Sequence, residues 1–152
     1  MSGERRIPNF RLHLRRPDLV VDAALEVFGR DGYEKGRLED IARKAGVTKS
    51  AIYHHFPSKL AVLEAVVRRH CLPETPGATP EILRVELATG KARAVLDLIL
   101  AEYRNLPEIA RLYWDEAVTR LASRAATDTE AAAAMLRAAI AAAIMERIFG
   151  KH

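Results

Sequence analysis

The sequence contains a single cysteine, Cys71, so no disulfide bond can form within the chain. Its longest unbroken apolar run, residues 138–145, is too short to cross a bilayer, and the basic first residues lack the apolar run of a signal peptide. The sequence shows no long internal repeat and no alternation of apolar and polar residues that would predict a strand. We therefore expect a soluble, cytoplasmic, all-α protein without a membrane partner.

The charge is distributed unevenly over the 152 residues. Residues 1–70 contain 14 Lys and Arg against 9 Asp and Glu, whereas residues 71–152 contain 10 against 11. A basic N-terminal half favours an anionic partner such as nucleic acid, because lysine and arginine near phosphates release condensed counterions. An ordinary solvated surface is the alternative reading of the same excess.

Helical spacing and end signals predict four helices in the N-terminal half, at about residues 17–32, 38–44, 48–55 and 59–70. Gly46 ends the second helix, and Ser58 is expected to cap the fourth. Two short helices joined by a glycine turn form a helix-turn-helix, whose second helix commonly lies in the major groove of DNA. The sequence therefore predicts a DNA-binding unit.

The stretch CLPETPGATP, residues 71–80, predicts a loop between two halves of the chain. Beyond it we expect helices that begin near Pro80, after Gly90, at Pro107 and near Asp128. The segment from Thr127 to Glu130 fits a capping box at the start of the last of these helices.

The last predicted helix, residues 128–149, is rich in alanine and apolar around its circumference. Such a helix should be covered on more than one side, so we expect part of it to face a partner chain. A central core helix within one chain is the alternative. The dimerisation candidates recur every four residues and are Leu136, Ile140, Ile144 and Ile148.

The segments DAALEVFGRDGYE and LEDIARKAGVTKSAIYHHFPSKLAVLEAVV make residues 17–70 closely resemble the DNA-binding domain of TetR-family transcriptional regulators. The resemblance implies an N-terminal three-helix helix-turn-helix domain, joined by a fourth helix to a small helical ligand-binding and dimerisation domain. It divides the chain into a basic arm (1–16), a DNA-binding domain with its connecting helix (17–70) and a C-terminal domain (71–152). Such regulators usually have two hydroxyl residues before the second helix, where this sequence has Gly36 and Arg37, so we expect a weaker cap there.

Helical geometry places Lys49, Ser50, Tyr53 and His54 on one face of the third helix and Ala51, Ile52, His55 and Phe56 on the other. Lysine can donate to guanine, and serine can donate or accept. The resemblance adds phosphate or base contacts at Tyr53, His54, His55 and Lys59. The alternative roles are packing for Tyr53, a satisfied helix-end position for His55 and ordinary solvation for Lys49 and Lys59. The DNA-binding candidates are Arg37, Thr48, Lys49, Ser50, Tyr53, His54, His55 and Lys59.

The sequence contains no recognisable catalytic set, phosphate-binding glycine loop or metal-ligand cluster, so we expect neither an enzyme nor a cofactor. The family resemblance implies a homodimeric repressor that binds a palindromic DNA operator and is released by a small-molecule effector. An effector-independent DNA-binding adaptor or architectural protein, acting through dimerisation or a protein partner, is the alternative. Effector-lining candidates, for which core packing is the alternative role, are Tyr103, Tyr113, Trp114 and Met135.

Overall fold

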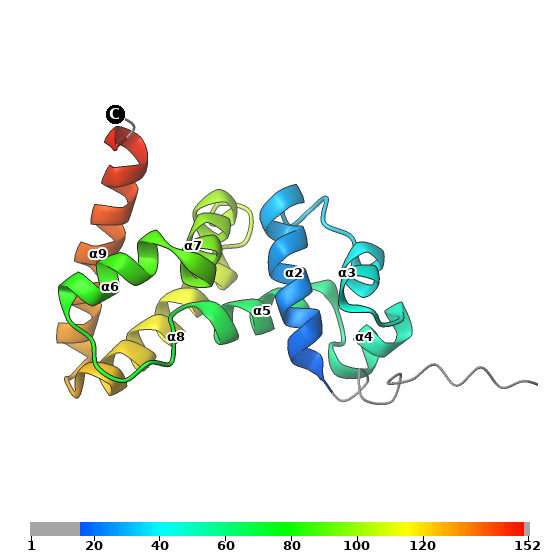
Figure 1. Ribbon diagram of the computed structural model, residues 1–152, viewed down its shortest axis with the longest axis horizontal. Coiled ribbons are helices and arrows are strands. Elements are labelled where there is room, and N and C mark those ends of the chain that lie inside the picture. The colour runs from blue at the N-terminus through cyan, green and yellow to red at the C-terminus, as the bar shows by residue number, and fades with distance from the viewer. Residues whose placement is uncertain (1–15, 151–152) are drawn as a thin grey trace, which may run out of the picture. The chain divides into compact units, whose positions relative to one another are not determined.

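The computed structural model describes residues 16–150, and all of their regular structure is helical, which confirms the predicted fold class (Figure 1). The chain divides into two compact units, Met1–Leu63 and Glu64–His152, and the division falls inside α5. The predicted basic arm lies outside the described residues except for Arg16. The helices are α2 (Pro17–Asp31), α3 (Leu38–Ala45), α4 (Lys49–His55), α5 (Lys59–His70), α6 (Pro80–Ala88), α7 (Gly90–Glu102), α8 (Pro107–Ala125) and α9 (Thr129–Phe149).

The ends of the helices in the N-terminal unit follow the predicted cap residues. Gly46 ends α3 in the left-handed region at φ 71°, and its amide donates to the carbonyls of the last turn. Thr48 Oγ1 accepts from the Ala51 amide at 3.1 Å and so caps α4. Ser58 Oγ accepts from the Ala61 amide at 3.0 Å at the start of α5. Three predicted boundaries are thus confirmed by their hydrogen bonds.

The predicted capping box at the start of the last helix is wrong by one residue. Asp128 caps α9, because its Oδ1 accepts from the Ala131 amide at 2.8 Å. Thr127 belongs to the end of α8 instead, where its amide donates to the Ala122 carbonyl at 3.0 Å. Ala126 adopts a left-handed conformation, φ 49°, which closes α8 and moves the next cap forward.

Three large side chains, Phe28 of α2, Ile41 of α3 and Ile52 of α4, are fully buried in the N-terminal unit. The turn that leads into α3 passes close to this core at Gly36. A Cβ at this position would lie 2.6 Å from Phe28 Cδ1 and 2.9 Å from the Gly32 carbonyl oxygen. Glycine is therefore required by close packing where the family pattern has a hydroxyl residue.

In the C-terminal unit α9 packs against α6 and α8, and α7 packs against the same two helices (Figure 1). No helix among residues 16–150 combines the length and apolar character needed to cross a membrane. Leu83, Leu87, Leu121 and Leu136 lie fully buried. These leucines come from α6, α8 and α9, so the core of the unit lies between them.

Two arginines of α8 hold the predicted loop against this unit. Arg120 donates to the backbone carbonyls of Arg68, Arg69 and Leu72, which caps the end of α5. Arg124 makes two hydrogen bonds to the Glu86 carboxylate, at 2.7 and 2.9 Å, and one to the Gly77 carbonyl at 2.9 Å. The side chains of this ion pair are only 6% and 13% exposed, so the pair is nearly dry.

Replacement of Gly36 tests the packing of the N-terminal unit. Gly36→Ala should lower the free energy of unfolding by about 1–3 kcal/mol, because the new methyl group overpacks the Phe28 ring. Gly29→Ala is the matched control, since no atom lies within 4 Å of its added Cβ and alanine favours the helix. Chemical denaturation of the full chain followed by circular dichroism measures both. Equal stability of the two variants would contradict the packing described.

Candidate nucleic-acid interface

Helix α4 has one buried and one exposed side. Ala51 and Ile52 are buried, whereas Tyr53 is 48% exposed. Lys49, Ser50 and His54 are also exposed, as the helical spacing predicts. His55 and Phe56 were predicted to lie on the same side as Ala51 and Ile52, but His55 is exposed and Phe56 is half-buried. Their rings lie edge to face 6.4 Å apart where the helix ends, so His55 adds to the exposed side. This exposed side of α4 is called the outward face below.

The Thr48 hydroxyl at the start of α4 is occupied as an acceptor by the Ala51 amide. It retains its own proton as a donor, which is suited to a phosphate oxygen. The amides of the first turn point the same way, and such helix starts favour anions. The sequence prediction of Thr48 as both cap and candidate contact is therefore compatible with its geometry.

Lys49 forms an ion pair with Glu39 across the turn between α3 and α4. Its Nζ lies 2.7 Å from Glu39 Oε1, and both side chains are 46% exposed. The hydrogen bond from Lys49 holds the pKa of the Glu39 carboxyl below its usual value, and the same bond raises the pKa of Lys49. Both groups are therefore charged at neutral pH.

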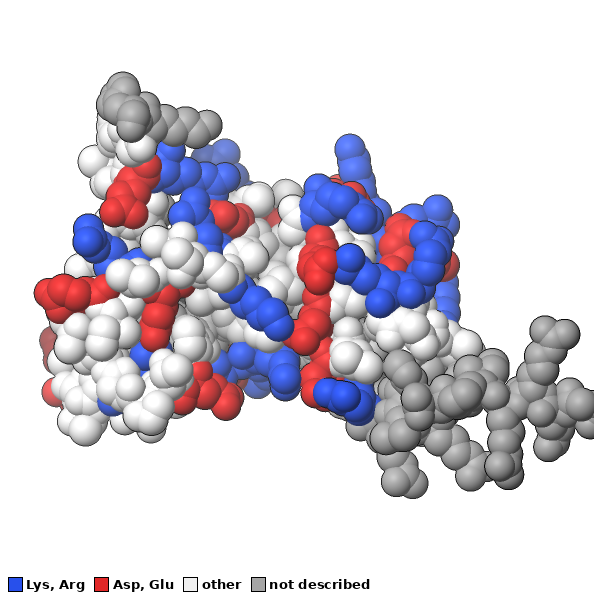
Figure 2. Space-filling view, in the orientation of Figure 1, with Lys and Arg blue, Asp and Glu red and all other residues white. Residues whose placement is uncertain are grey.

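Arg37 and Tyr53 belong to the same surface as this ion pair. Arg37 Nε lies 3.8 Å from Glu39 Oε2, and Tyr53 is exposed one turn after Lys49 on α4. Arg37 precedes α3 without making a side-chain cap, which confirms the expected weaker cap. Its side chain is 71% exposed and reaches away from the unit. Figure 2 shows lysine and arginine side chains gathered over α3, with acidic side chains among them.

Lys59 contacts the turn between α2 and α3. Its Nζ donates to the Glu34 carbonyl at 3.0 Å and lies 4.6 Å from the centre of the Tyr33 ring. A lysine at the start of a helix is disfavoured by the helix dipole, and these two contacts offset that cost. Lys59 therefore stabilises the unit whether or not it also meets a phosphate.

The sequence reasoning missed Glu39. It stands ten positions before Lys49, so no helical spacing connects the two residues. Only the turn at Gly46 brings the start of α3 and the start of α4 side by side. An acidic residue followed across such a turn by lysine is the one sequence signal that could have indicated the pair.

The four effector candidates of the C-terminal unit differ in burial. Tyr103 is 48% exposed, and its hydroxyl accepts from Arg104 at 2.9 Å. Tyr113 is buried, burial raises its pKa, and its hydroxyl has no hydrogen-bond partner within residues 16–150. Trp114 is half-buried with the Arg137 guanidinium 6.0 Å from its ring centre, and Met135 is half-buried.

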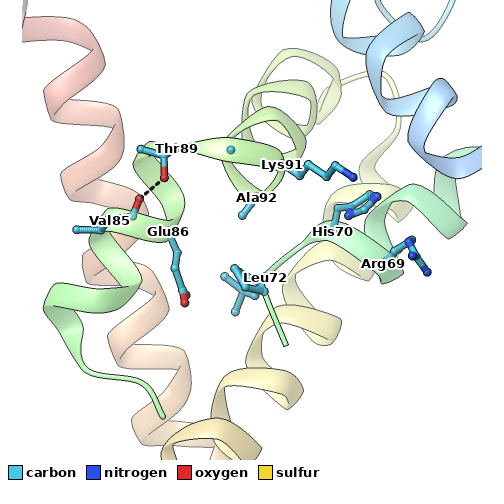
Figure 3. A pocket seen from close by; sticks show the side chains of 10 residues that line it. Arg69, His70, Leu72, Val85, Glu86, Thr89, Lys91 and Ala92 are labelled. Atoms are coloured by element: carbon cyan, nitrogen blue, oxygen red, sulfur yellow. Dashed lines mark hydrogen bonds between the residues drawn. The ribbon is translucent and has the colours of Figure 1, made fainter. Parts of the chain in front are cut away.

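A cavity of about 330 Å³ lies elsewhere in the C-terminal unit, and none of these four residues lines it (Figure 3). Its walls are the ends of α5 and α6, the first turn of α7 and the loop at Leu72 and Pro73. Figure 3 shows the Thr89 hydroxyl at one side of the cavity, where it donates to the Val85 carbonyl at 3.0 Å. Glu86, which pairs with Arg124, also lines it.

Comparison with known proteins identifies the N-terminal unit. Residues 20–66 match the family model for bacterial regulatory proteins of the tetR family. This region belongs to the TetR family. It contains all eight DNA-binding candidates and none of the four effector candidates.

Two transcriptional regulators match part of the chain. The chain is 48% identical over 63 residues to the regulator SrpR of Pseudomonas putida, which covers 41% of this chain and 30% of SrpR. It is 35% identical over 51 residues to IcaR of Staphylococcus aureus, a negative transcriptional regulator of a biofilm operon, covering 34% of this chain and 27% of IcaR. The match thus spans less than a third of either relative.

A solved structure extends the likeness of fold beyond the TetR-family region. GusR of Salmonella enterica has a TM-score of 0.59 to this chain and covers 98% of it, with 92% of GusR covered in return. The sequence identity is 20%, so this likeness concerns the fold alone. Both units of the chain therefore have a counterpart in a known helical fold.

The contacts of Lys59 predict a loss of stability in the TetR-family unit. Lys59→Ala should lower the free energy of unfolding by about 1 kcal/mol, because it removes a charge-assisted hydrogen bond and a cation–π contact. Lys35→Ala, an exposed lysine of the same turn, is the control and should change stability little. Urea denaturation of both variants measures the difference. Indistinguishable midpoints would show that the Lys59 contacts do not stabilise the unit.

Proposed function

We propose that the chain is a transcriptional regulator that binds duplex DNA through the outward face of α4. The observation that carries this proposal is that one side of the helix is buried and the other is exposed. Ala51 and Ile52 fix it to the core of a TetR-family region, while Lys49, Ser50 and Tyr53 stay exposed. A rigid helix with exposed donors and an aromatic side chain is suited to the major groove.

The regulator acts as a repressor in this proposal. IcaR, to which the chain is 35% identical over 51 residues, is named a negative regulator, and a protein bound over a promoter excludes the polymerase by occupancy. Transcription from a promoter that contains the bound site should therefore fall when the protein is added. A rise in transcription would show an activator that uses the same DNA-binding unit.

The proposal also includes a homodimer, joined through an exposed apolar stripe on α9. The stripe comprises Ala134, Ala138, Ala141, Met145 and Ile148. Steps of four and three residues keep these side chains on one face, which is the spacing of a coiled-coil seam. Small alanines allow close approach of two backbones, and the last two members, Met145 and Ile148, are 54% and 61% exposed.

Of the four dimerisation candidates predicted from the sequence, only Ile148 belongs to this stripe. Residues four positions apart are rotated by about 40° around a helix, so successive candidates point progressively away from the core and toward solvent. Leu136 is fully buried within its own unit, Ile140 and Ile144 are half-buried, and Ile148 is exposed. A dimer formed by α9 therefore uses Ile148 directly, while Leu136 supports the helix from inside.

A palindromic operator follows from such a two-fold dimer, because each subunit offers one α4 to one half-site.

A small-molecule effector completes the proposed function, and the 330 Å³ cavity of the C-terminal unit supports it as a binding space. An effector can release DNA only if it binds the DNA-bound and the DNA-free conformations of the protein with different affinity. A compound that raises the melting temperature and releases the duplex would identify the effector; duplex binding that no compound alters would favour an effector-independent adaptor.

Tyr53→Ala tests the outward face. The full chain is used to select duplexes from a random pool, and binding is then measured by fluorescence anisotropy over a range of salt concentrations. The variant should bind the selected duplex about tenfold more weakly with little change in melting temperature, because the Tyr53 side chain is 48% exposed. Tyr103→Ala is the matched control, since Tyr103 is also 48% exposed but lies in the C-terminal unit. Unchanged affinity of Tyr53→Ala would remove this residue from the interface.

Ala141→Arg tests the dimer seam. An arginine in the middle of the stripe places a charge and a long side chain between two close helices, so the variant should be monomeric by light scattering and retain its helical content. Ala101→Arg, at an exposed alanine of α7, should remain dimeric. A dimer that survives Ala141→Arg would exclude this face of α9 as the interface.

A further inference from the structure

A carboxylate of α3 adjoins the outward face of α4, although that face is proposed to meet a polyanion. Glu39 and Lys49 form an ion pair with 2.7 Å between Oε1 and Nζ, and both remain 46% exposed. A carboxylate on a surface that approaches phosphates repels them, and its neighbour Lys49 is already neutralised. The pair is therefore poorly suited to contact the phosphate backbone.

The pair has the hydrogen-bonding groups needed to recognise a base pair. It presents a donor, the Lys49 ammonium, directly beside an acceptor, the Glu39 carboxylate. The major-groove edge of a G·C pair presents the complement, with acceptors at guanine O6 and N7 beside the donor N4 amino group of cytosine. Lysine to guanine and glutamate to cytosine are both established pairings. An A·T pair also presents an acceptor beside a donor, but only G·C places two adjacent acceptors, N7 and O6, next to the one donor, so it offers more bonds to an ammonium beside a carboxylate.

The surroundings hold the pair in this arrangement. Glu39 lies in the first turn of α3, and Arg37 Nε stands 3.8 Å from its second carboxylate oxygen. Lys49 is the first residue of α4, directly after the Thr48 cap. The start of α3 is held by backbone hydrogen bonds to the Arg37 carbonyl, and the start of α4 by the Thr48 cap, so the donor and acceptor reach a base pair together.

We propose that Glu39 and Lys49 act as one unit that reads a G·C base pair in each half-site. The inference rests on the proposed function, since it requires that the outward face bind DNA. It makes Glu39 a specificity-determining residue that the sequence alone did not single out. Lys49 then contributes to the choice of sequence rather than to general affinity for DNA.

The test compares the sequence preferences of full-length variants. Duplexes are selected from a random pool with the unsubstituted protein, and each position of the selected site is then changed in turn. Glu39→Ala and Lys49→Ala should both lose the preference for G·C at the same position of the half-site, by about tenfold or more. The double variant should lose no more than either single one. The salt dependence of binding should stay the same, because no phosphate contact is removed.

Lys44→Ala is the matched control. Lys44 forms an ion pair of the same length, 2.7 Å, with Glu26 of α2, and it is similarly exposed. It should leave every sequence preference unchanged. Glu39→Gln provides a second, isosteric variant, and melting temperatures establish that all of the variants fold.

Three outcomes would overturn the proposal. Lys49→Ala could weaken binding equally for all duplexes and reduce the salt slope, which would make Lys49 a phosphate contact. Glu39→Ala could strengthen binding to every duplex, which would make the carboxylate a source of repulsion alone. The two variants could also affect different positions or an A·T pair. Failure of the unsubstituted protein to select any duplex would instead refute the proposed function itself.

Discussion

A helix of seven residues is too short to be stable in water by itself, so α4 depends on tertiary packing, above all on the burial of Ala51 and Ile52. Burying one isoleucine contributes about 1.5–3 kcal/mol. The left-handed Gly46 then sets the angle between α3 and α4. Because the inner side supplies the stability, the outward face is free to vary, and its Lys49 and Tyr53 can be selected for recognition rather than for packing.

Much of the fold could be predicted from the sequence because helix ends are local. A glycine such as Gly46 and a hydroxyl such as Thr48 act on atoms within one turn, and both are visible in the sequence as signals. The Glu39–Lys49 pair could not be predicted, because it depends on the angle between two helices. The cap of α9 also differed by one residue, since Thr127 was already used to end α8.

The C-terminal unit is held by different means, and its surfaces were harder to predict. Arg120 and Arg124, one turn apart on α8, fix the end of α5 and the proline-rich loop through carbonyl groups and a buried ion pair with Glu86. Such long side chains reach partners far away in the sequence. The exposed stripe of α9 likewise depends on how α6 and α8 cover that helix. The spacing of apolar residues in the sequence predicted correctly that α9 is apolar. It did not predict which side of the helix remains exposed.

The central claim is that the outward face of α4 contacts DNA, and alkylation of introduced cysteines tests it most directly. The one native thiol, Cys71, is buried and its pKa is raised by burial, so it gives little background reaction. Ser50→Cys on the outward face and Glu108→Cys on α8 are each alkylated with and without a selected duplex. The account predicts that duplex protects Ser50→Cys and leaves Glu108→Cys unprotected. Equal alkylation rates of Ser50→Cys in both conditions, with the duplex shown to be bound, would contradict it.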